Sequence, residues 1–176
     1  MKRLLMLTGF LLLFAGGQCF AMPVLNTLPE VFSGSLWGMS SAKVAEELDC
    51  ELSFAGKKVE NVMYTHTAGQ VLFAAHKWDV YLAFDDDQLD RVALVYSGGR
   101  DWHKAYMEAE VALTHEYGRP LDDVMVHEMP SVVQVASWHT RTSIVLLTKY
   151  TTHNVAPSSD LVIRFTRRTA GLKSDS

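Results

Sequence analysis

Seven histidines are the residues of this chain that could most directly hold a metal ion. They are His66, His76, His103, His115, His127, His139 and His153. A helical zinc site needs two histidines four positions apart, as in His-Glu-x-x-His, and that spacing does not occur. His103 and His115 lie twelve positions apart on one predicted helix, a rise of roughly 18 Å, so they cannot share an ion. A site assembled from several strands stays open, and no metal ligand is assigned.

Four aspartates close together, Asp85, Asp86, Asp87 and Asp90, could offer oxygen ligands to calcium. Their spacing is not that of an EF-hand loop, and the invariant glycine of such a loop has no counterpart here. A polar hairpin tip that keeps a sheet edge soluble explains the cluster equally well. The sequence therefore predicts no cofactor.

The sequence contains no pattern typical of nucleophilic catalysis, since no Gly-x-Ser-x-Gly elbow is present. Cys50 is flanked by Asp49 and Glu51, whose charges would raise the pKa of its thiol, so we interpret it as a small buried side chain. Gly98-Gly99-Arg100 lacks the further glycines, the lysine and the hydroxyl residue of a phosphate loop. No catalytic residue is assigned, and the pattern favours a protein that is not an enzyme.

Large aromatic side chains are the remaining candidates, because tryptophan and tyrosine dominate protein-binding hot spots. The four tryptophans lie near the ends of predicted elements, and three of them are expected in the core. Trp78 and Tyr81, in the central strands, are the preferred anchors for a partner protein. Tyr64, on an earlier strand, joins them if it faces the same way.

Two helices are predicted. The first covers about residues 40–49, with Ser40 as N-cap and Met39 placed to pack on Val44. The second covers about residues 101–117, and Gly118 followed by Pro120 gives it a strong stop signal. Its apolar stripe comprises Trp102, Ala105, Tyr106, Ala109, Leu113 and Tyr117.

The segments around these helices read as short strands. Four β-rich runs follow the first helix, and three follow the second. They cover residues 59–67, 71–75, 80–84, 89–96, 132–138, 143–149 and 161–166. Short strands with tight connections favour an antiparallel meander over parallel crossovers. We predict an α+β domain over residues 22–168, with two helices packed on one face of a mainly antiparallel sheet. The order also reads as one helix-plus-meander unit used twice.

The N-terminus has the three parts of a cleavable export signal. Lys2 and Arg3 form a positive region, residues 4–15 are apolar, and Cys19-Phe20-Ala21 is a small-x-small cleavage site. The apolar run is too short to span a bilayer, and no later segment is long and apolar enough to do so. Gln18 stands directly before Cys19, where a lipoprotein signal needs a small residue, so anchoring through Cys19 is disfavoured. We expect a periplasmic or secreted protein cleaved near Ala21.

Removal of residues 1–21 would also change the charge and the thiol count. The 16 basic residues would fall to 14 against 20 acidic ones, so the formal net charge would go from -4 to -6. This balance argues against a nucleic-acid partner. Cys50 would be the single remaining thiol, so the core and not a disulfide must hold the fold. Residues 169–176 are expected to form a flexible tail.

Several short motifs resemble a known group of folds. They are the segment 36–40 before the first helix, the hairpin 84–89, and the segment 117–120 followed by Trp138 and the run 144–146. In these motifs residues 35–167 resemble the β-lactamase-inhibitor-protein-like group, which includes the small outer-membrane lipoprotein that assists β-barrel assembly. The resemblance implies that fold and a role in binding other proteins, and it implies no catalytic residues.

Three functions stay open at this point. The preferred one is a periplasmic binding or adaptor domain that docks another exported or envelope protein through a sheet face or edge. The alternatives are an exported hydrolase or metal-dependent enzyme with a cross-strand site, and a small-molecule carrier with a pocket between sheet and helices. The sequence does not define the partner or the oligomeric state.

Overall fold

The computed structural model describes residues 35–59, 61–128, 131–152 and 159–168. The expected signal peptide (residues 1–21), with Cys19, and the expected tail (residues 169–176) lie outside the described residues. The elements, in chain order, are α1 (Ser41–Glu47), β1 (Ser53–Val59), β2 (Val62–Phe73), β3 (His76–Asp85), β4 (Gln88–Tyr96), α2 (Trp102–Tyr117), β5 (Asp122–Glu128), β6 (Ser131–His139), β7 (Ser143–Thr152) and β8 (Ser159–Arg167).

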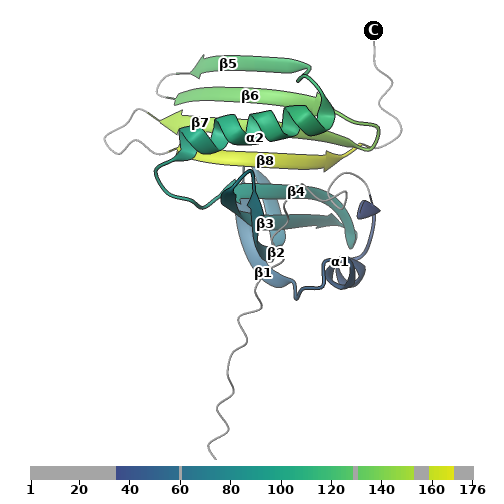
Figure 1. Ribbon diagram of the computed structural model, residues 1–176. Coiled ribbons are helices and arrows are strands. Elements are labelled where there is room, and N and C mark those ends of the chain that lie inside the picture. Colours follow the sequence, from purple (N-terminus) through teal and green to yellow (C-terminus); the bar gives the residue numbers. More distant parts are fainter. Residues whose placement is uncertain (1–34, 60, 129–130, 153–158, 169–176) are drawn as a thin grey trace, which may run out of the picture.

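All eight strands belong to one sheet with the order β1-β2-β3-β4-β8-β7-β6-β5. Every pairing is antiparallel. The last strand of the chain, β8, therefore lies in the middle of the sheet, between β4 and β7 (Figure 1). The strands β1 and β5 form the two outer edges.

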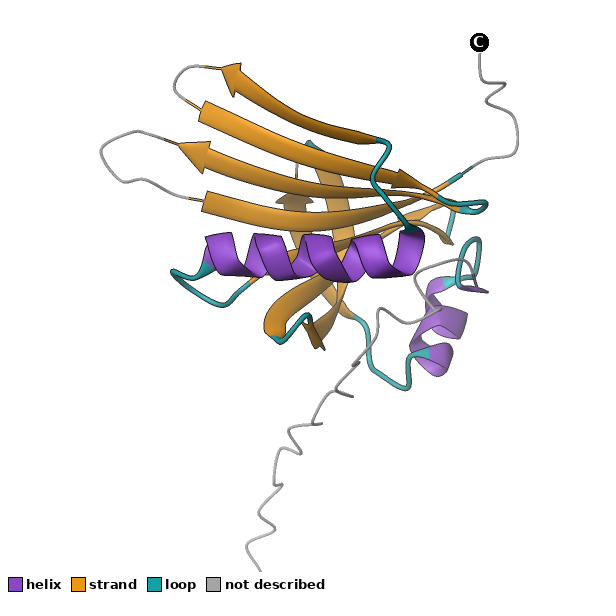
Figure 2. Ribbon diagram, turned by 45° about the horizontal axis from the view of Figure 1, so that its top comes forward, coloured by secondary structure: helices purple, strands orange, loops and turns teal. Residues whose placement is uncertain are grey.

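The longer helix α2 lies along β6, β7 and β8, and α1 lies beside β4 (Figures 1 and 2). The main core cluster includes Val44 of α1 together with Ala105, Tyr106, Ala109 and Leu113 of α2. Both helices thus contribute to the same core. The α+β class and the antiparallel sheet are confirmed.

Both faces of the central strands are buried, because successive side chains of a strand point to opposite faces. Leu94 of β4 and Ile163 of β8 join the main core, whereas their neighbours Ala93 and Val162 join a second cluster. That second cluster contains Val59, Tyr64, Ala83, Ala93 and Val162. It lies under the β1–β2 hairpin, which therefore covers the face of the sheet that α2 does not.

Local chemistry explains how the elements begin and end. Ser40 caps α1 by accepting a hydrogen bond from the Lys43 amide at 3.5 Å. The helix α2 ends at Gly118, whose φ of +83° is readily adopted by glycine and disfavoured for other residues. The Gly118 carbonyl accepts a hydrogen bond from Trp138 Nε1 at 2.9 Å, which fixes the end of α2 against β6.

The predicted helices agree with the structure, but three strand predictions need correction. The run 71–75 is no separate strand: it belongs to β2, which continues from residue 62 through a bulge between Thr67 and Gly69. The run 59–67 joins the end of β1 to the start of β2 across the turn at Asn61, which has a φ of +69°. The strand β5 was not predicted, so in the described part of the chain four strands and not three follow α2.

Candidate functional site

The three aromatic residues proposed as partner anchors do not form one exposed group. The side chains of Trp78 and Tyr64 are fully buried, with 0% exposure. Trp78 Nε1 donates to the Phe73 carbonyl at 3.0 Å, which holds the ring in the main core. Tyr64 lies in the second cluster, and the half-buried Tyr81 packs against that cluster. The expected exposure of Trp78 and Tyr64 is therefore wrong, and only Tyr81 of the three keeps side-chain surface.

The histidines are dispersed. His76 Nε2 lies 2.7 Å from Glu108 Oε2 and so links the start of β3 to α2. His66 hydrogen-bonds Thr65 Oγ1 and packs edge-on against Phe84. Within the described ranges, no group of three or more His, Cys, Asp or Glu side chains is placed to hold a metal ion. His153 lies outside those ranges.

The aspartate run builds a turn and caps a helix. Asp86 and Asp87 form the two-residue loop between β3 and β4, with φ values of +46° and +56°. Positive φ at both positions is the signature of a type I′ hairpin, which tolerates aspartate. Asp87 Oδ1 also accepts the Ser41 amide at 3.0 Å, and hydrogen bonds from Ser41 lower the pKa of this carboxyl. Asp86 and Asp87 therefore have local structural roles in the turn and at the start of α1.

The thiol and the glycine pair are also explained by local structure. Cys50 is half-buried, and burial together with the charge of Asp49 raises the pKa of its thiol. A raised pKa suppresses the thiolate that a nucleophile needs. Gly98 leaves no room for a Cβ beside the ring of Tyr96, and Gly99 has a φ of +82° in the turn that enters α2. These glycines are required by the turn itself.

A lysine is buried between α2 and the sheet. Lys149 of β7 is 9% exposed, and its Nζ lies 5.2 Å and 5.1 Å from the ring centroids of Trp102 and Tyr106. These are cation–π distances. Burial lowers the pKa of Lys149, although Glu110 partly offsets this effect. The arrangement ties α2 to β7.

The edge strand β5 is the most exposed regular element. Every side chain from Asp122 to His127 is exposed, on both faces of this strand, and the main contacts of α2 are with β6, β7 and β8. Three consecutive apolar residues lie here, with exposed fractions of 49% for Val124, 52% for Met125 and 40% for Val126. The preceding Leu121 is 65% exposed.

The two edges of the sheet differ in protection. On β1 the register shifts between Phe54 and Lys57, and two exposed lysines, Lys57 and Lys58, follow. Bulges and lysines are the usual means by which proteins keep an edge strand from pairing with another chain. Strand β5 pairs with β6 in unbroken register from Asp122 to Glu128 and lacks both devices. Its outer edge can therefore accept a further strand.

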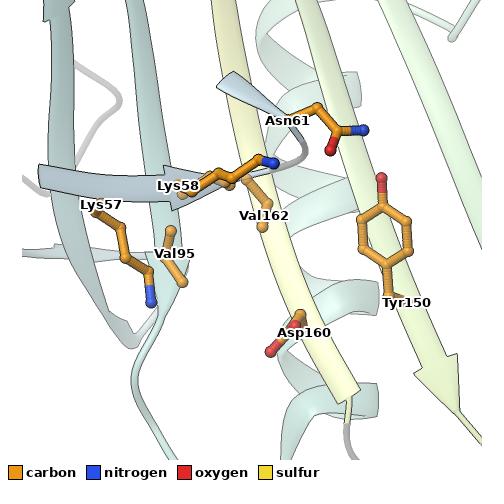
Figure 3. A pocket seen from close by; sticks show the side chains of 8 residues that line it. Lys57, Lys58, Asn61, Val95, Tyr150, Asp160 and Val162 are labelled. Carbon is orange, nitrogen blue, oxygen red and sulfur yellow. The ribbon is translucent and has the colours of Figure 1, made fainter. Parts of the chain in front are cut away.

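A hollow of about 330 Å³ lies at the other end of the sheet, beside the β1–β2 hairpin (Figure 3). Its lining comes from β1, β4, β7, β8 and the turn between β1 and β2. The lining residues are Lys57, Lys58, Val59, Asn61, Val95, Tyr150, Asp160 and Val162.

Sequence reasoning missed both the β5 edge and the hollow. A signal for β5 exists in the short Val-Met-Val run between Pro120 and Pro130, which two aspartates precede. The hollow has no local signal, because its residues come together only when the hairpin folds over β4 and β8.

The chain matches no family model, no curated protein and no solved structure. Within the described residues, neither helix is long and apolar enough to cross a membrane.

Proposed function

We propose that this chain is a non-catalytic binding or adaptor domain that docks another protein by adding a strand to β5. The observation that carries the proposal is the exposed run Val124, Met125 and Val126 on an edge strand in unbroken register. In strand addition, main-chain hydrogen bonds supply affinity and alternate side chains supply specificity. Strand β5 offers an apolar surface on each face for such side chains.

The charge around β5 defines the chemistry of the partner. Asp122 and Asp123 are exposed at the start of the strand, and the chain carries a formal net charge of -4. Opposite charges on facing strands stabilise a pairing, and like charges destabilise it. The partner segment is therefore extended and apolar at its centre, and it carries lysine or arginine opposite the two aspartates.

We place this docking outside the cytoplasm. Support comes from the sequence pattern of residues 1–21, which has the parts of a cleavable signal. The partner is then another exported or envelope protein. A mass spectrum of the protein purified from the periplasm would check this, because cleavage after Ala21 leaves a chain that begins at Met22 without an acyl group.

The fold is proposed to contain one helix-plus-meander unit twice. Support comes from the element order, in which each helix is followed by four consecutive strands, and from the sheet order, in which β4 and β8 are central. The likeness to the β-lactamase-inhibitor-protein-like group, and the protein-binding role that it implies, are proposed together with this repeat.

A pair of matched variants tests the docking surface. Val124→Lys places a charge on the exposed β5 surface, and Val111→Lys places the same charge on an exposed position of α2. We expect a periplasmic partner to be retained by the wild type and by V111K but lost with V124K. Hydrogen exchange of the purified complex should show new amide protection at residues 122–128.

Other results would overturn the proposal. Protection confined to other strands would place the interface elsewhere. A wild-type homodimer with protected β5 amides would make a second copy the occupant in place of a basic partner. Equal binding by V124K and the wild type would remove β5 from the interface.

A further inference from the structure

The floor and the rim of the hollow beside the β1–β2 hairpin differ in polarity. Three valines, Val59, Val95 and Val162, form an apolar floor that continues the second core cluster. The rim carries Lys57, Lys58, Asn61, Tyr150 and Asp160. An apolar floor with a few polar groups at the rim is the usual composition of a small-molecule site, and 330 Å³ lies at the small end of the range.

The rim is positively charged. Lys57 and Lys58 contribute two positive charges and Asp160 one negative charge, although the chain as a whole is acidic. The two lysines are consecutive on β1, so their side chains leave opposite faces of the strand. Neither Lys57 nor Lys58 forms an ion pair with any side chain in the described part of the chain. Figure 3 shows the Lys58 side chain running toward the Asn61 carboxamide, with the ring of Tyr150 directed toward the same end. Polar groups from three elements thus meet at one end of the hollow.

The hollow also lies away from the helices. Lys149 points toward α2, so the next residue of β7, Tyr150, points to the opposite face. The expected carrier pocket lies between sheet and helices, and this hollow does not coincide with it. It is equally separate from β5, which contributes nothing to its lining.

We propose that this hollow binds a small organic monoanion, a carboxylate with a short apolar chain. The chain rests on the three valines, and the carboxylate lies at the end of the hollow toward which Lys58, Asn61 and Tyr150 are directed, while Lys57 adds a second positive charge to the rim. Ammonium and amide donors bind carboxylates through charge-assisted hydrogen bonds. Asp160, on the opposite part of the rim, repels a second negative charge and so selects monoanions over dianions.

Hexanoate is a suitable probe, and hexylammonium has the same chain with the opposite charge. We expect hexanoate to bind with a dissociation constant in the millimolar range. The binding is measured by titrating the protein, expressed from residue 22 onward, and recording the NMR chemical shifts of its backbone amides. The shifts should centre on residues 57–61, 95, 150 and 160–162. Hexylammonium should leave these amides unchanged. The double variant Lys57→Gln/Lys58→Gln should weaken hexanoate binding about tenfold, because it removes both cations.

The control variant is Lys43→Gln/Lys77→Gln, which removes the same charge from exposed positions on α1 and β3. It should bind hexanoate like the wild type. Equal binding of hexanoate and hexylammonium, equal loss in both double variants, or no shift at the hollow would each overturn the proposal. V124K should bind hexanoate like the wild type. A negative result in the hexanoate titration therefore leaves the β5 docking proposal standing, and a negative result in the docking test leaves the hexanoate proposal standing.

Discussion

The Tyr106 hydroxyl is buried where α2 meets the sheet, and it makes no hydrogen bond with the described residues. Its side chain is 1% exposed, and the ring already contacts the Lys149 amine. A buried hydroxyl that has lost its water without gaining a partner destabilises the fold, by about 1–3 kcal/mol. Burial, with Glu110 and Asp123 nearby, raises the pKa of Tyr106 well above its ordinary value of 10.

Tyr106→Phe should therefore raise the free energy of unfolding by about 1 kcal/mol, because the ring stays and the hydroxyl leaves. The effect depends on pH. The folded state holds the phenolic proton more tightly than the unfolded state. The free energy of unfolding of the wild type is therefore unaffected by this group below pH 10, and it falls as pH rises from 10 toward the folded pKa. Y106F should lose less stability above pH 10 than the wild type. Urea titrations at pH 7 and above pH 10 measure both effects, and marked destabilisation at pH 7 would contradict them.

Strand periodicity could have corrected the choice of aromatic anchors. Trp78 and Tyr81 are three residues apart, so on a strand they must point to opposite faces and cannot form one surface. Trp78 belongs to the buried alternation with Val80 and Leu82. The burial of Tyr64 was not predictable in this way, because it depends on the hairpin folding over β4 and β8.

Among the elements, the hairpin between β2 and β3 contains a strained turn. Ala74 and Ala75 form its two-residue loop, with φ values of +49° and +61°. A left-handed conformation costs a non-glycine residue roughly 1–2 kcal/mol. Ala75→Gly should raise the free energy of unfolding by about 0.5–1 kcal/mol, because strain relief exceeds the added entropy of the unfolded chain.

The matched control for this turn is Ala42→Gly, at an exposed position inside α1. Glycine lowers helix stability by about 1 kcal/mol relative to alanine. Thermal unfolding should therefore show melting temperatures that move in opposite directions for the two variants. A lower melting temperature for A75G would contradict the strain assigned to the turn.

His76 of β3 and Glu108 of α2 form a polar contact between these elements, with their side chains 2.7 Å apart. A double-mutant cycle with His76→Ala and Glu108→Ala should give a coupling energy of about 0.5–1 kcal/mol, a modest value because Glu108 is 41% exposed. Glu116→Ala, an exposed position on the same helix, should show no coupling to His76→Ala. Coupling of equal size for both pairs would rule out a specific link.

The sequence predicted the helices better than the edge strands, for a physical reason. Helix ends carry capping signals such as Ser40 and Gly118, which act within a few residues. The strands β1 and β5 are exposed on most side chains, so they lack the alternation of buried and exposed residues that marks an inner strand. The strand β1 is placed by its pairing with β2, and β5 by its pairing with β6, rather than by burial of their own side chains.

For the whole molecule, we expect a single cooperative unfolding transition. The main core cluster contains residues from β2, β3 and β4 as well as α2, β6, β7 and β8, so neither half of the chain has a core of its own. Calorimetry should give equal calorimetric and van't Hoff enthalpies. Two resolved transitions would show that the halves fold separately.

The central place of β8 also sets the time at which the sheet can form. Ribosomal synthesis delivers the chain from its N-terminus, so β4 and β7 stay unpaired on their inner sides until residues 159–167 have emerged. The sheet is thereby completed only after β8 has emerged, and contacts between distant segments make its formation slow. Such a delay would keep the polypeptide open to threading through a translocation channel, as the proposed export requires.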